Sequence, residues 1–232
     1  MEDIMKNDVS IIIPAYNPDE KLINLVKELK KNKYDKIIVV DDGSFDLGIF
    51  RNLKKSVVVL HHRHNKGKGR ALKTGFEYCL EKFDDITGII TVDADGQHTI
   101  EDVNKVYREF QLNRKKVILG SRNLVLKEVP IKNKIGNKII NKMIGNKFKI
   151  KIKDTQTGLR AIPIKRIKHL KQIKGERFEY ETNMIIECIK RNIKIIEVPI
   201  KTIYLDKNKR SNFKTITDSV KICKTVINGW KI

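Results

Sequence analysis

The chain has 232 residues, 40% hydrophobic and 33% charged, so it can bury a globular core and is not a disordered tail. No apolar run approaches the roughly 20 residues of a membrane-spanning helix, and the polar N-terminus lacks the apolar core of a signal peptide. The three cysteines lie far apart, which excludes a disulfide framework and a zinc module. We therefore expect reduced thiols in a cytoplasmic protein.

The net charge of +21 is distributed unevenly along the chain. The first 116 residues have 21 Lys and Arg against 19 Asp and Glu, whereas the remaining 116 have 28 against 9. A Lys-rich genome or a thermophilic composition would explain many lysines. It would not explain why acidic residues become scarce in one half only. We therefore expect the second half to meet an anionic partner.

Short apolar runs rich in β-branched residues alternate with helical patterns in the first half. The runs at 9–13, 37–40, 57–60, 89–92 and 117–119 are predicted strands. One helix is predicted to begin at Asn17-Pro18 with Asn17 as its N-cap, a second spans 70–81, and a third follows Thr99 as cap. Buried strands that alternate with helices indicate an α/β fold with a doubly wound, mostly parallel sheet.

Each of these five strands is followed by a polar cluster. The clusters are Pro14-Ala15-Tyr16-Asn17, Asp41-Asp42-Gly43-Ser44, Asn65 to Arg70, Asp93 to His98, and Gly120-Ser121-Arg122. Because ligands of such sheets bind beyond the carboxyl ends of the strands, we expect one shared site there. Neither a Walker A motif nor a Gly-x-Gly-x-x-Gly dinucleotide fingerprint is present, which disfavours classical NTPases and dehydrogenases.

Asp93 and Asp95 are the strongest candidates for metal ligands. Two carboxylates that are two residues apart after a strand can bind one hard divalent cation, and Gln97 offers a further oxygen. A magnesium or manganese ion held there would bridge a diphosphate. His61, His62 and His64 are close in sequence, but we interpret them as ordinary polar residues at a strand end.

The motifs Pro-Ala-Tyr-Asn, Val-Asp-Asp-Gly-Ser, Asn-x-Gly-Lys-Gly-x-Ala-Leu and Asp-Ala-Asp-Gly-Gln-His, in this order, resemble those of family 2 inverting glycosyltransferases with the GT-A fold. Further motifs at 120–122, 154–160, 178–182 and 197–200 are similar to the dolichyl-phosphate mannose synthase branch. The resemblance covers about residues 9–220. It implies a single glycosyltransferase domain over 1–232, with a nucleotide-sugar-binding half (1–122) and an acceptor-binding, membrane-facing half (123–232).

The resemblance also implies roles for individual residues. The nucleotide base and ribose would be held by Pro14, Tyr16, Asn17, Val40 and Asp42. The metal and diphosphate would be held by Asp93, Ala94, Asp95 and Gln97, with Arg122 on phosphate oxygens.

Two departures from the family pattern matter. Pro18 stands where relatives often have an acid, and Arg210-Ser211-Asn212-Phe213 replaces a Ser-His-Phe or Ser-Lys pattern. The first puts base recognition at this corner in question, and the second passes phosphate contact to Arg210 or Lys209.

No acidic residue occurs between Glu128 and Asp154, a segment that has eight lysines and apolar residues at near-helical spacing. It is either an ordinary surface helix or a helix that faces anionic lipid or phosphate. We expect Lys134, Lys138 and Arg160 to contact the acceptor phosphate. Residues 213–230 form a second such candidate, with Trp230 near its end.

The acceptor decides whether a general base is needed. A lipid phosphate is already an anionic nucleophile, whereas a sugar hydroxyl needs a base, for which Glu179 and Glu181 are the candidates. We take Asp95, Arg122 and Glu181 as the catalytic candidates.

The expected function is metal-dependent transfer of a hexose from a nucleotide-diphosphate sugar to a polyprenyl phosphate. The expected place is the cytoplasmic membrane face, with the protein peripherally associated. The first alternative is a glycosyltransferase acting on a sugar hydroxyl. A nucleic-acid-binding protein is disfavoured by the 6% aromatic content. A sugar-nucleotide pyrophosphorylase is disfavoured because its glycine-rich first loop is missing.

Overall fold

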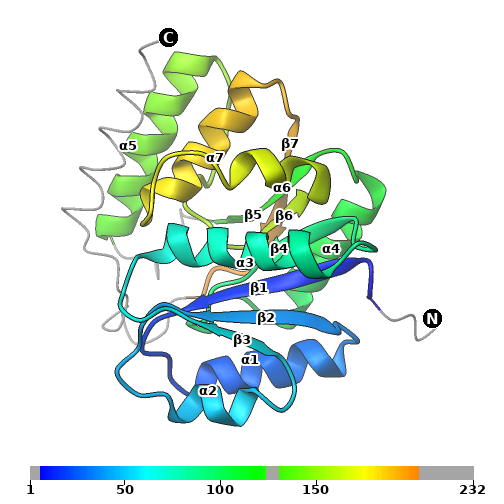
Figure 1. Cartoon of the computed structure of the whole chain (residues 1–232). Helices are drawn as coiled ribbons and strands as arrows, with labels where there is room; N and C mark the ends of the chain where they lie inside the picture. Colours follow the sequence, from blue (N-terminus) through cyan, green and yellow to red (C-terminus); the bar gives the residue numbers. More distant parts are fainter. Residues whose placement is uncertain (1–5, 124–130, 204–232) are drawn as a thin grey trace.

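The computed structural model describes residues 6–123 and 131–203, and for 131–136 it describes the helical backbone alone (Figure 1). Its centre is a seven-stranded sheet with the strand order β3-β2-β1-β4-β6-β5-β7. Within the described residues, no helix has the length and apolar character needed to cross a membrane.

Six strands of the sheet run in the same direction. They are β1 (Val9–Ala15), β2 (Lys36–Asp41), β3 (Val58–His61), β4 (Gly88–Thr91), β5 (Val117–Arg122) and β7 (Ile195–Ile200). The remaining strand, β6 (Arg160–Pro163), is antiparallel and lies between β4 and β5. The predicted doubly wound, mostly parallel sheet is therefore confirmed, with β6 as the exception.

Helices cover both faces of the sheet, because strand side chains alternate between two apolar cores. Ile11 and Ile13 pack in one core with residues of α1 (Glu20–Lys31), α2 (Gly48–Leu53) and α4 (Ile100–Leu112). Ile12 packs in the other core with residues of α3 (Lys68–Lys82), α6 (Ile164–Leu170) and α7 (Glu179–Lys190). Burial on both faces explains why these strands consist of continuous apolar runs.

The predicted start of α1 was wrong by two residues. Asn17 has a left-handed backbone with φ of 47°, and the N-cap is Asp19, whose side chain accepts a hydrogen bond from the Lys21 amide. The cap of α4 is confirmed, since the Thr99 side chain accepts from the Asp102 amide. Both Asn and Asp are good caps, so composition alone could not choose between them.

The acid-free basic segment forms α5 (Ile131–Phe148). Ile140 and Ile144 are buried in a small third cluster with Ile186 of α7, so α5 packs on another helix rather than directly on the sheet. Figure 1 shows α5 beside α7 at the outer side of the molecule. The candidate segment at 213–230 lies outside the described residues.

Candidate active site

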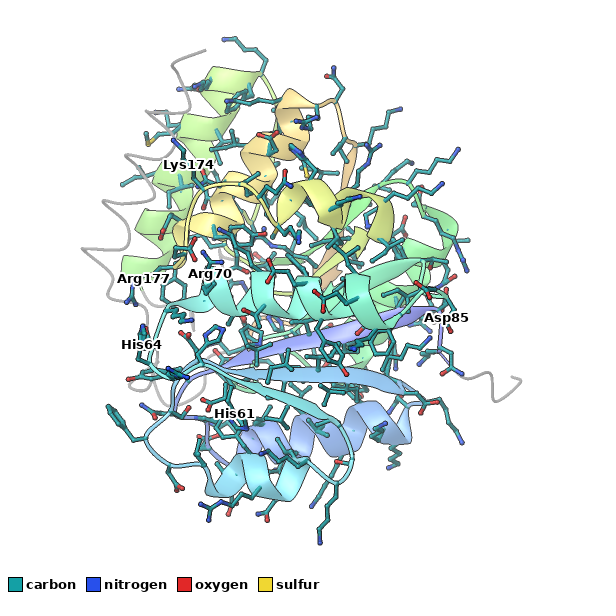
Figure 2. The ribbon with its side chains drawn as sticks, in the orientation of Figure 1. His61, His64, Arg70, Asp85, Lys174 and Arg177 are labelled. Carbon is teal, nitrogen blue, oxygen red and sulfur yellow. The ribbon has the colours of Figure 1, made fainter. Side chains whose placement is uncertain are left out.

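The carboxyl ends of β1 to β5 lie at one edge of the sheet, because these five strands are parallel to one another. The polar loops that follow the strands therefore meet along this edge, as the sequence predicts for a ligand site. Figure 2 shows His64, Arg70 and Arg177 on this side of the molecule, with Asp85 at the opposite end.

Lys68 is the central charge of this edge. Its ammonium lies 2.7 Å from Asp93 Oδ1 and 2.8 Å from Glu181 Oε2. Burial alone would lower the pKa of Lys68, but the two carboxylates outweigh it and raise the pKa above its usual value. One half-buried cation thus joins the loop after β4 to the first turn of α7.

Asp93 and Asp95 form the predicted carboxylate pair. Burial acts to raise the pKa of Asp93, but the charge of Lys68 and contact with His98 outweigh it and hold this pKa well below its usual range. Desolvation and then the charge of Asp93 raise the pKa of Asp95. Gly158 packs against the same site, because a Cβ there would lie 2.2 Å from Asp93 Oδ2.

This pair has the ligand chemistry of a divalent-cation site. A bound Mg²⁺ or Mn²⁺ would relieve the repulsion between the two carboxylates, whose oxygens are the ligands that these ions prefer. Across residues 6–123 and 131–203, no group of three or more His, Cys, Asp or Glu side chains could hold a metal ion. The main chain of Gln97 donates to Asp95 Oδ1 at 3.0 Å, so the loop folds around the pair.

Asp42 shapes the glycine loop, which we define as residues 65–69. Its carboxylate is only 3% exposed and accepts from the amides of Lys66 (2.9 Å) and Gly67 (2.7 Å). His62 Nδ1 also contacts it at 2.7 Å. The structure thus shows that Asp42 holds this loop, and its contact with the nucleotide stays a prediction.

The glycine loop also contacts the second half of the chain. Arg70 and Lys73 of α3 both bind the carboxylate of Glu176, and Arg177 donates to Asn65 at 3.1 Å. Gly67 has φ of +107°, and a Cβ there would lie 2.4 Å from the Glu176 carbonyl oxygen. A side chain at this position would therefore push the loop away from its partner segment.

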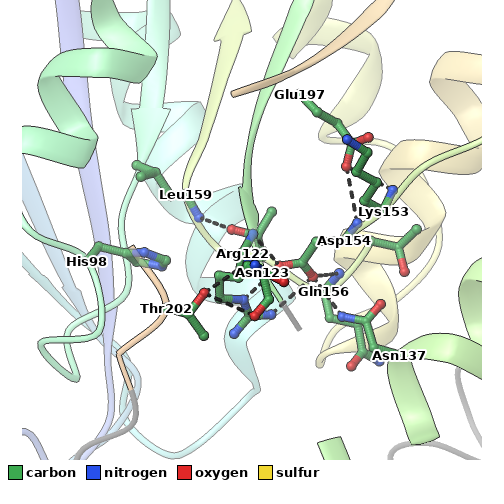
Figure 3. Close-up of polar contacts among 12 residues, drawn as sticks. His98, Arg122, Asn123, Asn137, Lys153, Asp154, Gln156, Leu159, Glu197 and Thr202 are labelled. Atoms are coloured by element: carbon green, nitrogen blue, oxygen red, sulfur yellow. Dashed lines mark hydrogen bonds and ion pairs between the residues drawn. The ribbon is translucent and has the colours of Figure 1, made fainter. Parts of the chain in front are cut away.

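Arg122 stands at the end of β5, where a phosphate contact was predicted. Its Nε and Nη2 donate to Asp154 at 2.7 and 3.1 Å, and Asn137 Nδ2 donates to the same carboxylate at 2.7 Å (Figure 3). Asp154 is fully buried. The guanidinium is therefore held by a carboxylate from the second half of the chain.

The predicted base-binding corner is assembled from the loops after β1 and β2. The Asn17 amide donates to Ser44 Oγ at 2.8 Å, and Asn17 Oδ1 accepts from the Phe45 amide at 3.0 Å. The rings of Tyr16 and Phe45 lie 6.2 Å apart. Pro14 is half-buried beside them, whereas the Val40 side chain is fully buried and leaves only its backbone for a ligand.

Arg160 does not fit the predicted acceptor-phosphate role. It is 1% exposed, and its guanidinium donates to the carbonyl oxygens of Thr157, Glu181 and Thr155. Its charge is used to tie the loop before β6 to α7. Lys138 lies exposed on α5. The Lys134 side chain and Arg210 lie outside the described residues.

Three residues of the site were not predicted from the sequence. Lys68, His98 and Asp154 each lie inside one of the sequence motifs, next to residues predicted for the site. Lys68 and Asp154 contact partners far away in the chain, Glu181 and Arg122, whereas His98 contacts Asp93 of its own loop. Motif position alone could mark them as candidates, but only the fold shows which charges they meet.

The chain is similar in sequence to known proteins. The family model described as Glycosyl transferase family 2 matches residues 10–170. A UDP-N-acetylglucosamine–dolichyl-phosphate N-acetylglucosaminyltransferase of Methanococcus voltae is 35% identical over 222 residues, covering 85% of this chain and 86% of that one. An uncharacterized protein of Methanocaldococcus jannaschii is 36% identical, with 94% and 90% covered.

The fold is also shared with solved structures. Glucosyl-3-phosphoglycerate synthase from Mycobacterium tuberculosis, crystallised with Mn²⁺, UDP and glucosyl-3-phosphoglycerate, superposes with a TM-score of 0.71 at 14% identity, covering 97% of this chain and 80% of that one. This similarity supports the GT-A architecture. Together with the match to the family model over most of the described chain, it leads to one conclusion: the chain belongs to glycosyl transferase family 2.

Proposed function

We propose that this glycosyltransferase moves a sugar from a UDP-sugar to a polyprenyl phosphate of the dolichyl type. The observation that supports a nucleotide-diphosphate donor is the Asp93–Asp95 pair, which lies with Lys68 and Arg122 at one edge of the sheet. The names of relatives support UDP as the nucleotide and a dolichyl-type phosphate as the acceptor. The Methanococcus voltae relative is a dolichyl-phosphate transferase that uses UDP-N-acetylglucosamine, and a Saccharomyces cerevisiae relative, 26% identical, is a dolichyl-phosphate beta-glucosyltransferase.

In this proposal the residues of the chain act mainly on the leaving nucleotide diphosphate. Asp93 and Asp95 would hold the metal, Arg122 would contact phosphate oxygens, and Lys68 keeps Asp93 ionised. A bound Mg²⁺ or Mn²⁺ would neutralise the charge that develops as the diphosphate departs. The acceptor phosphate attacks the anomeric carbon from the opposite face, and the configuration inverts.

A hydroxyl acceptor stays the second candidate, and one observation favours it. Among the described residues, nothing donates a hydrogen bond to the buried Glu181 Oε1, which lies 4.0 Å from Arg160 Nε, while Oε2 pairs with Lys68. A carboxylate oxygen so placed could accept a proton from a sugar hydroxyl. The basic second half favours phosphate instead, because a hydroxyl acceptor does not explain the excess of 28 basic over 9 acidic residues after Lys116.

The acceptor also suggests where the protein acts. Lys138, Ile139 and Lys142 are exposed on α5, so this helix offers both cationic and apolar groups to a surface. Contact with an anionic leaflet would bring the edge of the sheet close to a lipid phosphate. We therefore place the enzyme at the cytoplasmic membrane face as a peripheral protein.

The test is transfer of labelled sugar by the purified protein. UDP-N-acetylglucosamine, UDP-glucose and GDP-mannose are each incubated with Mn²⁺ or Mg²⁺ and polyprenyl phosphate, and the lipid is extracted. We expect labelled lipid with a UDP-sugar. Label that enters only an added oligosaccharide would overturn the phosphate acceptor, and transfer from GDP-mannose alone would overturn the UDP assignment.

A further inference from the structure

The carboxylate of Asp154 is the meeting point of three segments of the chain. It is fully buried and accepts from the Arg122 side chain, from Asn137 Nδ2 at 2.7 Å and from the Gln156 amide at 3.2 Å. The Arg122 amide also donates to it, at 3.3 Å. A buried carboxylate needs such donors, so the network is held together by the cost of leaving any oxygen unpaired.

This contact fixes the direction of the Arg122 guanidinium. Nε and Nη2 form the two-pronged arrangement that Arg makes with carboxylates, which constrains the plane as well as the position of the group. Burial acts to raise the pKa of Asp154, but the charge of Arg122 outweighs it and holds this pKa low, so the pair is ionic. Without Asp154, the Arg122 side chain could change rotamer freely until it bound phosphate. The entropy lost on ordering it would then weaken phosphate binding.

Asparagines of α5 hold the loop that contains Asp154. Asn137 is 2% exposed, and one turn later Asn141 accepts from Thr155 Oγ1 at 2.7 Å. From the other side, Glu197 of β7 accepts from the amides of Lys153 (2.9 Å) and Asp154 (3.1 Å). Figure 3 shows Asn137 and Glu197 approaching the Asp154 loop from different elements. The loop is therefore clamped between α5 and β7.

We infer that Asn137 and Asp154 are positioning residues that aim Arg122 at the diphosphate of the donor, so that helix α5 supports the nucleotide site as well as the acceptor side. This inference rests on the proposed function, because it takes Arg122 as the phosphate contact. Neither residue touches the donor. Their effect on turnover passes entirely through the guanidinium of Arg122.

Helix α5 contains its own matched control. The tetrapeptide Ile135-Gly136-Asn137-Lys138 recurs as Ile144-Gly145-Asn146-Lys147, but Asn146 is exposed whereas Asn137 is buried against Asp154. Asn137→Ala and Asn146→Ala therefore make the same change on the same helix. Only the first removes a donor from the carboxylate that holds Arg122.

The experiment is a double-mutant cycle with Arg122→Ala, read as kcat/KM for sugar transfer and as the calorimetric Kd for UDP with Mn²⁺. We expect Asn137→Ala to lower kcat/KM about tenfold and to weaken UDP binding, the scale of one lost hydrogen bond to a charged group. Asn146→Ala should stay within about twofold of wild type. In the Arg122→Ala background, Asn137→Ala should cost nothing further. An equal loss in both backgrounds would overturn the inference.

A spectroscopic readout separates positioning from a general loss of structure. In ¹H–¹⁵N spectra, the Arg122 Nε–H, assigned by its disappearance in Arg122→Lys, should exchange slowly in wild type and in Asn146→Ala. It should exchange faster in Asn137→Ala and in Asp154→Asn, measured well below the melting temperature of each variant. Unchanged exchange in Asn137→Ala would overturn the inference. A wild type that binds UDP and shows this pattern but transfers no sugar would instead overturn the proposed function alone.

Discussion

A single ammonium group contacts carboxylates from both halves of the sequence. Lys68 lies between Asp93, in the loop after β4, and Glu181, in the first turn of α7. Its charge offsets two negative groups that would otherwise repel each other in a desolvated site. The same contact holds Asp93 ionised, which is the form that binds a cation.

Replacing Lys68 by Met should therefore reduce both stability and activity. Removing one partner of a buried ion pair costs about 3–5 kcal/mol, because the remaining charges are left uncompensated. The loss here should be smaller, because the side chains of Lys68 and Asp93 are 14% and 26% exposed. Adding Glu181→Gln should recover much of the melting temperature but not the sugar transfer. Lys66→Met, in the same loop but exposed, is the control and should leave both nearly unchanged. Full transfer activity in Lys68→Met would contradict the role of Lys68 in keeping Asp93 ionised.

The metal prediction concerns Asp95. Asp95→Asn should keep the fold, since this strand-end side chain adds little core packing, and should abolish transfer by weakening metal binding. Wild-type activity should disappear in excess chelator and return with Mg²⁺ or Mn²⁺. The measurements are transfer assays beside thermal melting curves of both proteins. Full activity in chelator would exclude metal-dependent transfer.

Elements were predictable where their sequence signals are local. The β-branched runs located β1 to β5 to within one to three residues at each end, because burial on both faces demands continuous apolar sequence. Helix α2 was not predicted, since its six residues are too few to show a period. Strand β6 is short and ends at Pro163, so only its neighbours β4 and β5 mark it as a strand.

The sequence predicted which residues belong to the site better than it predicted which contacts they make. Asp93 and Asp95 follow from spacing after a strand, which is local information. The buried positions of Arg160 and Asp42 could not be predicted from local sequence, because each side chain binds backbone groups of other segments. A charged residue within a motif can equally bind a ligand or hold the loops that do, and the sequence shows both in the same way.

We predict that the lysines of helix α5 bind the protein to anionic membranes. Replacing Lys134, Lys138 and Lys142 with Gln should release the protein from anionic liposomes, at about 1 kcal/mol for each lysine near the surface. Wild-type binding should need anionic lipid and weaken as salt rises. The control replaces Lys27, Lys31 and Lys54, exposed lysines at α1 and α2, which should leave binding intact.

Co-sedimentation measures this with neutral liposomes, anionic liposomes and duplex DNA at two salt concentrations. An ordinary surface helix would give no liposome binding in the wild type. Tight DNA binding that the α5 substitutions abolish would favour the nucleic-acid alternative. Either result would contradict the membrane placement.

At the scale of the whole molecule, the two halves of the sequence share one sheet. β6 and β7 come from the second half, yet β6 lies between β4 and β5 of the first half, and β7 pairs with β5. The nucleotide-binding loops are further joined to the second half through Glu176 and Glu181. The halves therefore differ in charge and in proposed role without being separate folding units.

A fragment of residues 1–122 should consequently fail to form the native sheet. The fragment lacks both β6 and β7, so β4 keeps one unpaired edge and β5 loses both of the strands with which it pairs. We expect aggregation or a broad, non-cooperative melt, and no calorimetric binding of UDP. The full chain is the control. A cooperative melt of the fragment with UDP affinity close to that of the full chain would show that the first half folds alone.

The insertion of β6 also sets a delay during synthesis on the ribosome. Strand β4 is complete at Thr91, but its neighbour begins only at Arg160. At about 5–20 residues per second, the nascent chain displays an open strand edge for roughly 4–14 s before that neighbour is made. Chaperones that cover nascent β-edges should therefore matter most within this interval, and pauses in translation between β4 and β6 should lower the yield of native enzyme more than pauses elsewhere.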